Sequence, residues 1–487
     1  MEHALVLSLL LFVFTFVCLF LHHFISKRAQ ETVAANQTSE KPPLPPGTTG
    51  WPLIGETLDY FSKVLHGCPE KFVSERRDKY SSKVFRTSII GQPMAILGGA
   101  EGNKLLFSNE SKLVQVWWPS SIDKIFPKSH NKTNHEDFID VRKMLSASLK
   151  ADALQKFVGT NDAVMKQHLQ TDWDRDEVKV SLVVKGYTLA LACRLFLSIS
   201  DPREVRKLAK PIEDISQGIL SMAVNFPGTA FSRAVKASKA MRKEVEVMIK
   251  QRKTELSEKR ATPTQDILSQ MLLSTDDNGR FSNEVDIASY LVGLLHGGYG
   301  TVNAALTFVM KYLAEHPDVY DEVLREQMEI AKSEDRRELL TWEELRRMKY
   351  SWNVVNEVLR MTPPILGAFR EAITDFNYAG YMIPKGWKLH WIAHDAHKNS
   401  EYFLNPEKFM PSRFEGNGPA PYTFVPFGGG PRMCPGNEYT RMVILVFLHN
   451  VVMKFRWEKV IPNEKIVSDP HPRPSLGLPI RLYPHKH

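Results

Sequence analysis

Cysteine is scarce in this chain of 487 residues, with four in all, at positions 18, 68, 193 and 434, and no two of them form a Cys-x-x-Cys pair. So few and so scattered cysteines exclude a disulfide scaffold. The sequence has no internal repeat and no array of basic and aromatic residues, so nothing indicates nucleic-acid binding. The formal net charge is only +8, which is compatible with an acidic partner or anionic lipid.

Hydrophobic residues make up 43% of the chain and charged residues 24%, as in an ordinary globular protein with a sizeable core. One long apolar run stands at the N-terminus, where residues 4–21 carry no charge. With residues 22–25 it is long enough to cross a membrane as a helix. A cleavable signal peptide is the alternative, but no positive residue precedes the run and no small-x-small site follows it. Lys27 and Arg28 follow the run, which predicts a single-pass anchor with the rest of the chain in the cytosol.

Residues 26–50 are expected to form a linker, with a stiff proline-rich hinge that begins at Lys41. Residues 51–487 show no second shift in composition and are expected to form one large, mainly α domain with a small β region. Apolar residues at helical spacing predict helices over 138–158, 160–172, 236–259, 284–316 and 317–332. Short strands are expected near Val84–Ile90, Pro93–Leu97, Tyr378–Ile383 and Lys388–Ile392.

A glycine-rich loop around Cys434 carries the most informative signal. The segment from Phe427 to Gly436 reads FGGGPRMCPG, and an apolar helical pattern follows from Tyr439 to Val452. Unpaired N–H groups and the positive end of a helix dipole favour a thiolate at such a place. Glycines also let N–H groups point at the sulfur, and such hydrogen bonds tune a metal that the sulfur binds. The spacing Phe-x-x-Gly-x-Arg-x-Cys-x-Gly therefore argues against a buried structural cysteine.

This loop resembles the heme-binding signature of the cytochrome P-450 family. The resemblance implies the P-450 fold, heme b as cofactor, Cys434 as the ligand of the iron, and Phe427 and Gly436 as further heme contacts. Two more segments match in the family's order, Glu-x-x-Arg at 357–360 and Phe-x-Pro-x-Arg-Phe at 409–414. The resemblance implies a buried structural triad of Glu357, Arg360 and Arg413. It also makes three arginines candidates for the heme propionates, namely Arg142, Arg370 and Arg432.

The segment around residue 300 resembles the family's helix above the heme, but it departs from the usual Ala/Gly-Gly-x-Asp/Glu-Thr-Thr/Ser pattern. Thr301 remains, whereas Gly300 stands at the acid position and Val302 at the second hydroxyl position. In the family, the threonine and the acid help to relay protons. Either water chains in the groove at Gly300 replace the acid, or the enzyme rearranges or dehydrates a pre-oxidised lipid. Tyr299 and His296 are further candidate proton donors. Because Thr301 is retained, oxygenation is the favoured interpretation.

The resemblance extends from Pro43 to the end of the chain and is strongest to the triterpenoid-oxidising branch of the plant enzymes. Segments 44–57, 102–104, 117–121, 226–230 and 424–435 carry it. The chain resembles both β-amyrin 28-oxidases and the dammarenediol 12-hydroxylase, and residues 369–376 look closer to the latter. The family's substrate-contact regions map here onto apolar residues, which suit a large lipophile. The predicted pocket residues are Trp117, Leu294, Leu295, Ile365, Leu366 and Leu476.

Together these features predict a heme-thiolate monooxygenase that hydroxylates a dammarane- or oleanane-type triterpenoid with O2. Its electrons are expected from an NADPH-dependent cytochrome P-450 reductase, and its anchor is expected to lie in the endoplasmic reticulum membrane. A non-catalytic, membrane-tethered lipid- or heme-binding protein is the rival hypothesis. That rival gives no reason for Thr301 in a glycine-rich helix.

Overall fold

The computed structural model describes residues 15, 42–52, 54–127, 145, 148–219, 221, 223–274, 283–332, 339–468 and 470–485. The predicted anchor (apart from Thr15) and linker residues 26–41 lie outside the described residues, as does Arg142. The chain divides into two compact units. The first comprises Met1–Lys63, Cys68–Trp117 and Ala368–Trp391, and the second Val64–Gly67, Trp118–Gly367 and Ile392–His487. Each unit draws on separated stretches of sequence, a division that no shift in composition marks.

The first unit is built on a five-stranded sheet with the strand order β1-β2-β8-β5-β3. Strands β1 and β2 form an antiparallel hairpin, β2 pairs in parallel with β8, and β3 pairs antiparallel with β5. Every residue of β8 is buried, as expected for a strand covered on both faces. The elements are α2 (Thr57–Leu65), α3 (Glu70–Tyr80), β1 (Val84–Ile89), β2 (Gln92–Leu97), α4 (Gly99–Ser108), β3 (Val114–Val116), β5 (Gly367–Ala372), β6 (Phe376–Tyr378), β7 (Tyr381–Ile383) and β8 (Lys388–Ile392).

The strand predicted over Tyr378–Ile383 is wrong in one respect, because two short antiparallel strands, β6 and β7, occupy this region. Ala379 and Gly380 connect them with φ angles of 51° and 83°. Two consecutive residues with positive φ form the tight hairpin turn that reverses the chain. The aromatic and apolar residues on both sides of the turn favour β-structure, so the sequence predicts one strand across it.

The proline-rich segment lies against the first unit's strands. The N–H of Arg86 on β1 donates to the carbonyl of Pro46 at 2.8 Å, and the N–H of Met382 on β7 donates to that of Pro43 at 2.9 Å. Gly47 has a φ of 143°, and a Cβ there would lie 2.1 Å from the carbonyl oxygen of Arg86. Prolines lack an N–H but keep the carbonyl, so this segment contributes acceptors to the strands.

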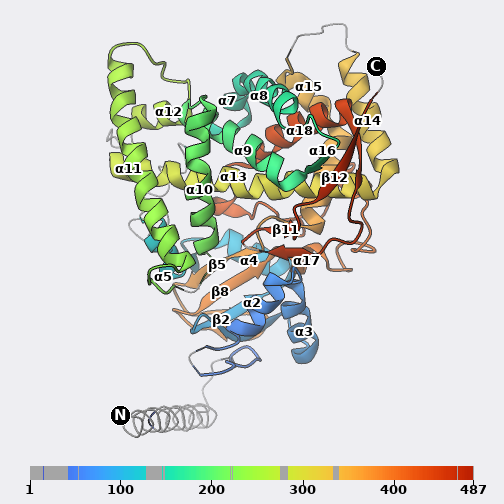
Figure 1. The fold of residues 1–487 in the computed structure, drawn as a ribbon. Helices are drawn as coiled ribbons and strands as arrows, with labels where there is room; N and C mark the ends of the chain where they lie inside the picture. The colour runs from blue at the N-terminus through green and yellow to red at the C-terminus, as the bar shows by residue number, and fades with distance from the viewer. Residues whose placement is uncertain are drawn as a thin grey trace, which may run out of the picture. The chain divides into compact units, whose positions relative to one another are not determined.

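The second unit is mainly helical, and its central element is α13, the 32-residue helix Glu284–Glu315. Figure 1 shows α13 in yellow, crossing this unit, and it packs against α9, α11, α16 and α18. The helices are α5 (Ser120–Ile125), α7 (Ala151–Leu154), α8 (Val158–Thr171), α9 (Val180–Leu197), α10 (Pro202–Ile219), α11 (Ala230–Ser257), α12 (Ile267–Leu273), α13, α14 (Pro317–Ala331), α15 (Trp342–Arg347), α16 (Lys349–Met361), α17 (Ala393–His397) and α18 (Asn437–Lys454).

Short helices and small sheets complete the second unit. Strands β4, β12 and β9 form a three-stranded sheet, and β10 pairs with β11. These elements are η1 (Gln155–Phe157), η2 (Pro411–Phe414), η3 (Gly430–Arg432), β4 (Glu177–Lys179), β9 (Phe455–Lys459), β10 (Ile466–Ser468), β11 (Pro472–Pro474) and β12 (Pro479–Pro484).

The predicted helices over 160–172, 236–259, 284–316 and 317–332 correspond to α8, α11, α13 and α14. The single helix predicted over 138–158 is wrong in its described part, because Lys150 adopts an extended conformation with ψ 162° before α7 begins. Helix α9 has the length and composition of a membrane span, yet 67% of it is buried inside this unit. Helix α9 is therefore a core helix of this unit, and it contacts α13, α8 and α10.

Candidate functional site

Cys434 lies in the loop that joins η3 to α18, and its side chain is exposed. The loop is held by its own backbone: the N–H of Cys434 donates to the carbonyl of Phe427 at 2.8 Å. Gly428 and Gly430 have φ angles of 70° and 64°, which L side chains rarely adopt, so these two turns require glycine. Helix α18 begins three residues after the cysteine, and the positive end of its dipole favours an anionic sulfur. A Cβ on Gly436 would lie 3.8 Å from Sγ. The loop thus presents one exposed sulfur on a rigid turn.

A single cysteine sulfur is a protein ligand that can hold a porphyrin-bound iron, whereas a metal held by protein alone needs several side chains. Within the described residues, no group of three or more His, Cys, Asp or Glu side chains is arranged to hold a metal ion. The donor set at Cys434 therefore fits heme.

Helix α13 has an open face that ends at Thr301. Gly293, Gly297 and Thr301 follow one another at i, i+4 and i+8, so they lie in one row along the helix. A Cβ on Gly293 or on Gly297 would meet no described atom within 4 Å, whereas one on Gly298 would lie 3.2 Å from Phe196. The row therefore provides a side-chain-free surface against which a flat group can lie.

The Thr301 hydroxyl donates to the carbonyl of Gly297, one turn earlier, at 2.6 Å. This back-bond fixes the hydroxyl proton and leaves the oxygen lone pairs as acceptors. The two other predicted proton donors lie elsewhere on α13. Buried Tyr299 donates to Glu213 at 3.5 Å, and His296 Nδ1 lies 3.2 Å from the hydroxyl of Ser216. Burial and Glu213 raise the pKa of Tyr299, which makes it a poor proton donor at neutral pH.

The predicted triad residues Glu357, Arg360 and Arg413 are in contact. Arg360 pairs with Glu357 through two hydrogen bonds, Nε to Oε2 at 2.7 Å and Nη2 to Oε1 at 2.8 Å, and neither side chain is exposed to solvent. Arg413 Nε lies 3.3 Å from Oε1 of the same carboxylate, and the N–H of Met410 donates to Oε1 at 2.9 Å. The buried charge is therefore both paired and hydrogen-bonded, as a buried ion requires.

Hydrogen bonds connect this triad to the cysteine loop through His397. Arg360 Nη1 donates to the carbonyl of His397 at 2.8 Å, and the N–H of Val425 donates to Nε2 of the same histidine at 2.8 Å. Val425 then accepts from the N–H of Gly428 at 3.0 Å. Burial holds the pKa of His397 well below its usual range, so the ring is neutral and Nε2 can act as an acceptor.

The predicted propionate-binding arginines differ in their surroundings. Arg370 is buried in the first unit, where its Nε donates to Glu110 at 3.0 Å and its Nη1 to the carbonyl of Phe369 at 2.9 Å. Arg432 is half-buried in η3 of the second unit, two residues before the cysteine. Arg142 lies outside the described residues. The three propionate contacts stay predictions.

The predicted pocket residues also differ in exposure. In the second unit, Ile365 and Leu476 are 43% and 54% exposed, Leu294 and Leu366 are half-buried, and Leu295 is fully buried in the core. In the first unit, the half-buried ring of Trp117 packs edge-on against Phe369. The exposed apolar residues are available to a lipophilic ligand, and the roles of all six stay predictions.

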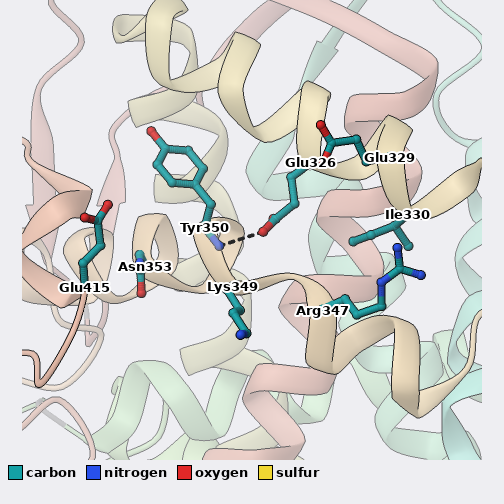
Figure 2. Close-up of a pocket in the computed structure, with 8 residues that line it drawn as sticks. All are labelled: Glu326, Glu329, Ile330, Arg347, Lys349, Tyr350, Asn353 and Glu415. Carbon is teal, nitrogen blue, oxygen red and sulfur yellow. Dashed lines mark hydrogen bonds between the residues drawn. The ribbon is translucent and has the colours of Figure 1, made fainter.

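A polar hollow between α14 and α16 has a structural origin (Figure 2). Glu326 accepts hydrogen bonds there from the N–H groups of Tyr350 and Ser351, at 2.7 and 2.9 Å. These N–H groups belong to the first turn of α16, where no helical partner is available, so the carboxylate caps the helix. The hollow is therefore not a candidate for the chemistry.

His471 was missed by sequence reasoning. It precedes β11, which packs against α13, and its Nε2 lies 2.7 Å from the position that a Cβ on Gly300 would take. The sequence offers one signal, the glycine at position 300 in place of the acid. This glycine indicates that another side chain fills the space beside α13 but does not identify that side chain.

Comparisons with known proteins agree with this geometry. The cytochrome P450 family model matches residues 45–487. A β-amyrin 16-β-monooxygenase from Platycodon grandiflorus is 57% identical, covering 93% of this chain and 96% of that protein. A β-amyrin 28-monooxygenase from Medicago truncatula is 53% identical over the full length of both chains. The structure of a cyanobacterial protein with bound retinoic acid superposes with a TM-score of 0.83 at 28% identity, over 92% of this chain and all of that one.

Proposed function

Because the chain belongs to the cytochrome P450 family, we propose that it hydroxylates an oleanane-type triterpene, with β-amyrin as the substrate to test first. The chain is a cytochrome P450 monooxygenase with a mainly helical fold, so the predicted fold class and enzyme class are confirmed. The predicted triterpenoid-oxidising branch is confirmed as well, because relatives 53–57% identical over nearly the whole chain carry β-amyrin oxidase names. The closer resemblance to the dammarenediol enzyme stays a prediction.

The family implies a heme-thiolate cofactor, and we propose heme b held by Cys434. When bound, this group supplies dioxygen activation and the insertion of oxygen into an unactivated C–H bond. The chain's own residues then have defined tasks. Cys434 would hold the iron. The open face of α13 would leave room beside the bound group, and Thr301 would offer its hydroxyl oxygen there. The observation that carries the proposal is the exposed sulfur on its rigid loop, in a chain so similar to triterpene oxidases.

Exposed apolar side chains support a large, nearly nonpolar substrate. A ligand that covers Ile365 and Leu476 would gain the most hydrophobic free energy there, because each side chain presents about half of its surface to solvent. A triterpene has a wide hydrocarbon skeleton with few polar groups, and such a ligand is held mainly by shape.

The partner and the membrane follow from the same class. We propose that electrons come from an NADPH-dependent flavoprotein reductase and that residues 1–25 anchor the enzyme in the endoplasmic reticulum membrane. A net charge of +8 favours an acidic reductase surface. A lipid-bound substrate also suits an enzyme tethered to the bilayer.

Expression in yeast with a plant reductase tests the proposal. Cells fed or engineered to make β-amyrin, α-amyrin, lupeol and dammarenediol are extracted, and products are identified by mass spectrometry and NMR. An oxygenated β-amyrin that is absent with Cys434→Ser supports the proposal. If only dammarenediol is converted, the substrate is a dammarane and not an oleanane. A heme-loaded enzyme that converts none of the four would overturn the triterpene substrate class.

The rival reaction on a pre-oxidised lipid is tested in the same system. Purified enzyme is given a lipid hydroperoxide without NADPH, and in parallel β-amyrin with NADPH and reductase. Product from the hydroperoxide alone would favour the isomerase or dehydratase, and no product in either reaction would favour a binding protein.

A further inference from the structure

The acid that the family places on α13 has no side-chain counterpart at Gly300, but its place is filled by His471. An ideal Cβ on Gly300 would lie 2.7 Å from Nε2 and 2.8 Å from Cδ2 of the His471 ring. Non-bonded carbon atoms lie about 3.5–4.0 Å apart at their optimum, so a side chain at 300 and this ring exclude one another. The glycine at 300 therefore leaves the space that the His471 imidazole occupies, in place of a side chain on residue 300.

A single hydrogen bond orients the ring. His471 Nδ1 lies 3.1 Å from the carbonyl oxygen of Pro364, which can only accept, so Nδ1 carries the proton. Nε2 of the neutral ring is then an acceptor that is shielded from solvent and has no hydrogen-bond partner in the described part of the chain. Burial lowers the pKa of His471, which keeps the ring neutral between proton transfers.

Polar groups act on this ring within the second unit. The His296 ring, one turn before Gly300, lies 6.3 Å from the His471 ring between centroids. Glu213 raises the pKa of His471 and Lys185 lowers it, and these two side chains form an ion pair at 2.9 Å with each about one third exposed. The ring thus lies against the helix that carries Thr301, and a partly exposed ion pair acts on its charge.

We propose that His471 replaces the missing carboxylate as the group that passes protons from solvent toward Thr301. This inference rests on the proposed monooxygenase function. Hydroxylation consumes one substrate, one O2, two electrons from the reductase and two protons, and releases the alcohol and one water. For each proton delivered, Nε2 takes up one proton from a water molecule that enters beside the ring and gives it up on the side of Thr301, so the ring returns to its neutral state. His471 acts through other groups and is a positioning residue for the proton supply.

The steric part is tested by the thermal stability of the heme-loaded enzyme. Gly300→Ala should lower the melting temperature of the wild type but not that of a His471→Asn variant, because the shorter side chain leaves room for the methyl group. Asparagine also keeps an N–H near the Nδ1 position for the Pro364 carbonyl. Equal effects of Gly300→Ala in both backgrounds would overturn the assigned contact.

The proton supply is tested by the amount of product formed per NADPH consumed. His471→Asn should lower this ratio about tenfold. This is less than the roughly 10²–10⁴-fold that a group acting directly on the reacting atoms contributes, because His471 acts through other groups. Adding Gly300→Asp should restore a large part of the ratio. Hydrogen peroxide supplies oxygen, electrons and protons together, so peroxide-driven hydroxylation should fall far less. His316→Asn, at the C-terminal end of α13, is the matched control and should change neither reaction.

The outcomes separate the two proposals. If the wild type hydroxylates β-amyrin and His471→Asn leaves the ratio unchanged, the relay is wrong and the function stands. An equal fall of the NADPH-driven and the peroxide-driven reactions would show that His471 is merely structural. If the wild type hydroxylates no triterpene, the proposed function fails first.

Discussion

Replacing Arg360 with methionine should lower the free energy of unfolding of the protein by about 3–5 kcal/mol, the usual cost of breaking a buried ion pair. Arg360 is fully buried and makes two hydrogen bonds to Glu357 and one to the carbonyl of His397. Methionine is apolar and fills much of the same volume, so little of the loss comes from a cavity. The loss comes from the carboxylate, which keeps only the 3.3 Å contact with Arg413 and the N–H of Met410.

The double variant Glu357→Gln/Arg360→Met isolates this cause. It removes the buried negative charge, while the glutamine oxygen still accepts from Met410 and Arg413. About half of the lost stability should therefore return, because a neutral amide costs far less to bury than an unpaired carboxylate. A surface pair supplies the matched control: Arg346→Met removes a 3.4 Å contact with Glu343 and should cost less than about 1 kcal/mol.

Urea unfolding followed by circular dichroism measures these differences, with the Soret band of the reduced carbon monoxide complex recorded in parallel. Arg360→Met should shift the urea midpoint clearly below that of the wild type and of Arg346→Met. If the double variant proved less stable than Arg360→Met alone, the uncompensated charge would not be the cause and the reasoning would fail.

Three further predictions concern other parts of the molecule. Cys434→Ser should keep the far-ultraviolet circular dichroism but lose the shifted Soret band and all turnover, and survival of the band would contradict the ligand assignment. Burial lowers the pKa of His390 to about 4, so the free energy of unfolding should fall by up to about 3 kcal/mol as the pH falls from about 6.5 to 4. The urea midpoint of His390→Asn should depend less on pH in this range, and the same pH dependence as in the wild type would refute this. Ile365→Trp should reduce triterpene turnover about tenfold, whereas Leu404→Trp, at a residue 77% exposed, should leave it unchanged. Equal turnover in both variants would show that Ile365 does not line the pocket.

The direction of the pH effect follows from the hydrogen bonds of His390. Its Nδ1 lies 3.1 Å from the carbonyl of Ala368 and its Nε2 lies 2.9 Å from the hydroxyl of Tyr60, so the native ring is neutral and accepts from the tyrosine. Below pH 6.5 the unfolded chain binds a proton that the native ring refuses until about pH 4. Native stability is therefore complete above pH 6.5 and is lost as the pH falls.

Local signals made much of the site predictable. The loop around Cys434 could be identified because its glycines, its arginine and its cysteine lie within ten residues and act on each other directly. The long helix α13 was predictable within one residue because its apolar period continues from Glu284 to the end. The hairpin at Ala379 and Gly380 was missed because the residues on both sides of these two positive-φ positions favour β-structure equally.

Contacts between distant segments could not be predicted in this way. Arg370 pairs with Glu110, 260 positions away, and neither residue carries a local signal of the other. The same holds for Gly300 and His471, which meet because β11 returns to pack against α13. The sequence alone shows that position 300 lacks the acid that the family usually has there, whereas the fold shows which side chain occupies the space beside it.

The route from the triad to the cysteine loop gives the buried charges a task beyond stability. Arg360 and Val425 both bond to His397, one at its carbonyl and one at its ring, and Val425 accepts from Gly428 at the start of the turn that ends in Cys434. A change at Arg360 therefore acts on the position of the sulfur through three hydrogen bonds, whereas a core substitution outside this route does not. Val443→Ala on α18, where the side chain is fully buried, serves as that comparison. At urea concentrations where both variants are equally folded, Arg360→Met should have lost more of the shifted Soret band, because its sulfur has lost the support that orients it.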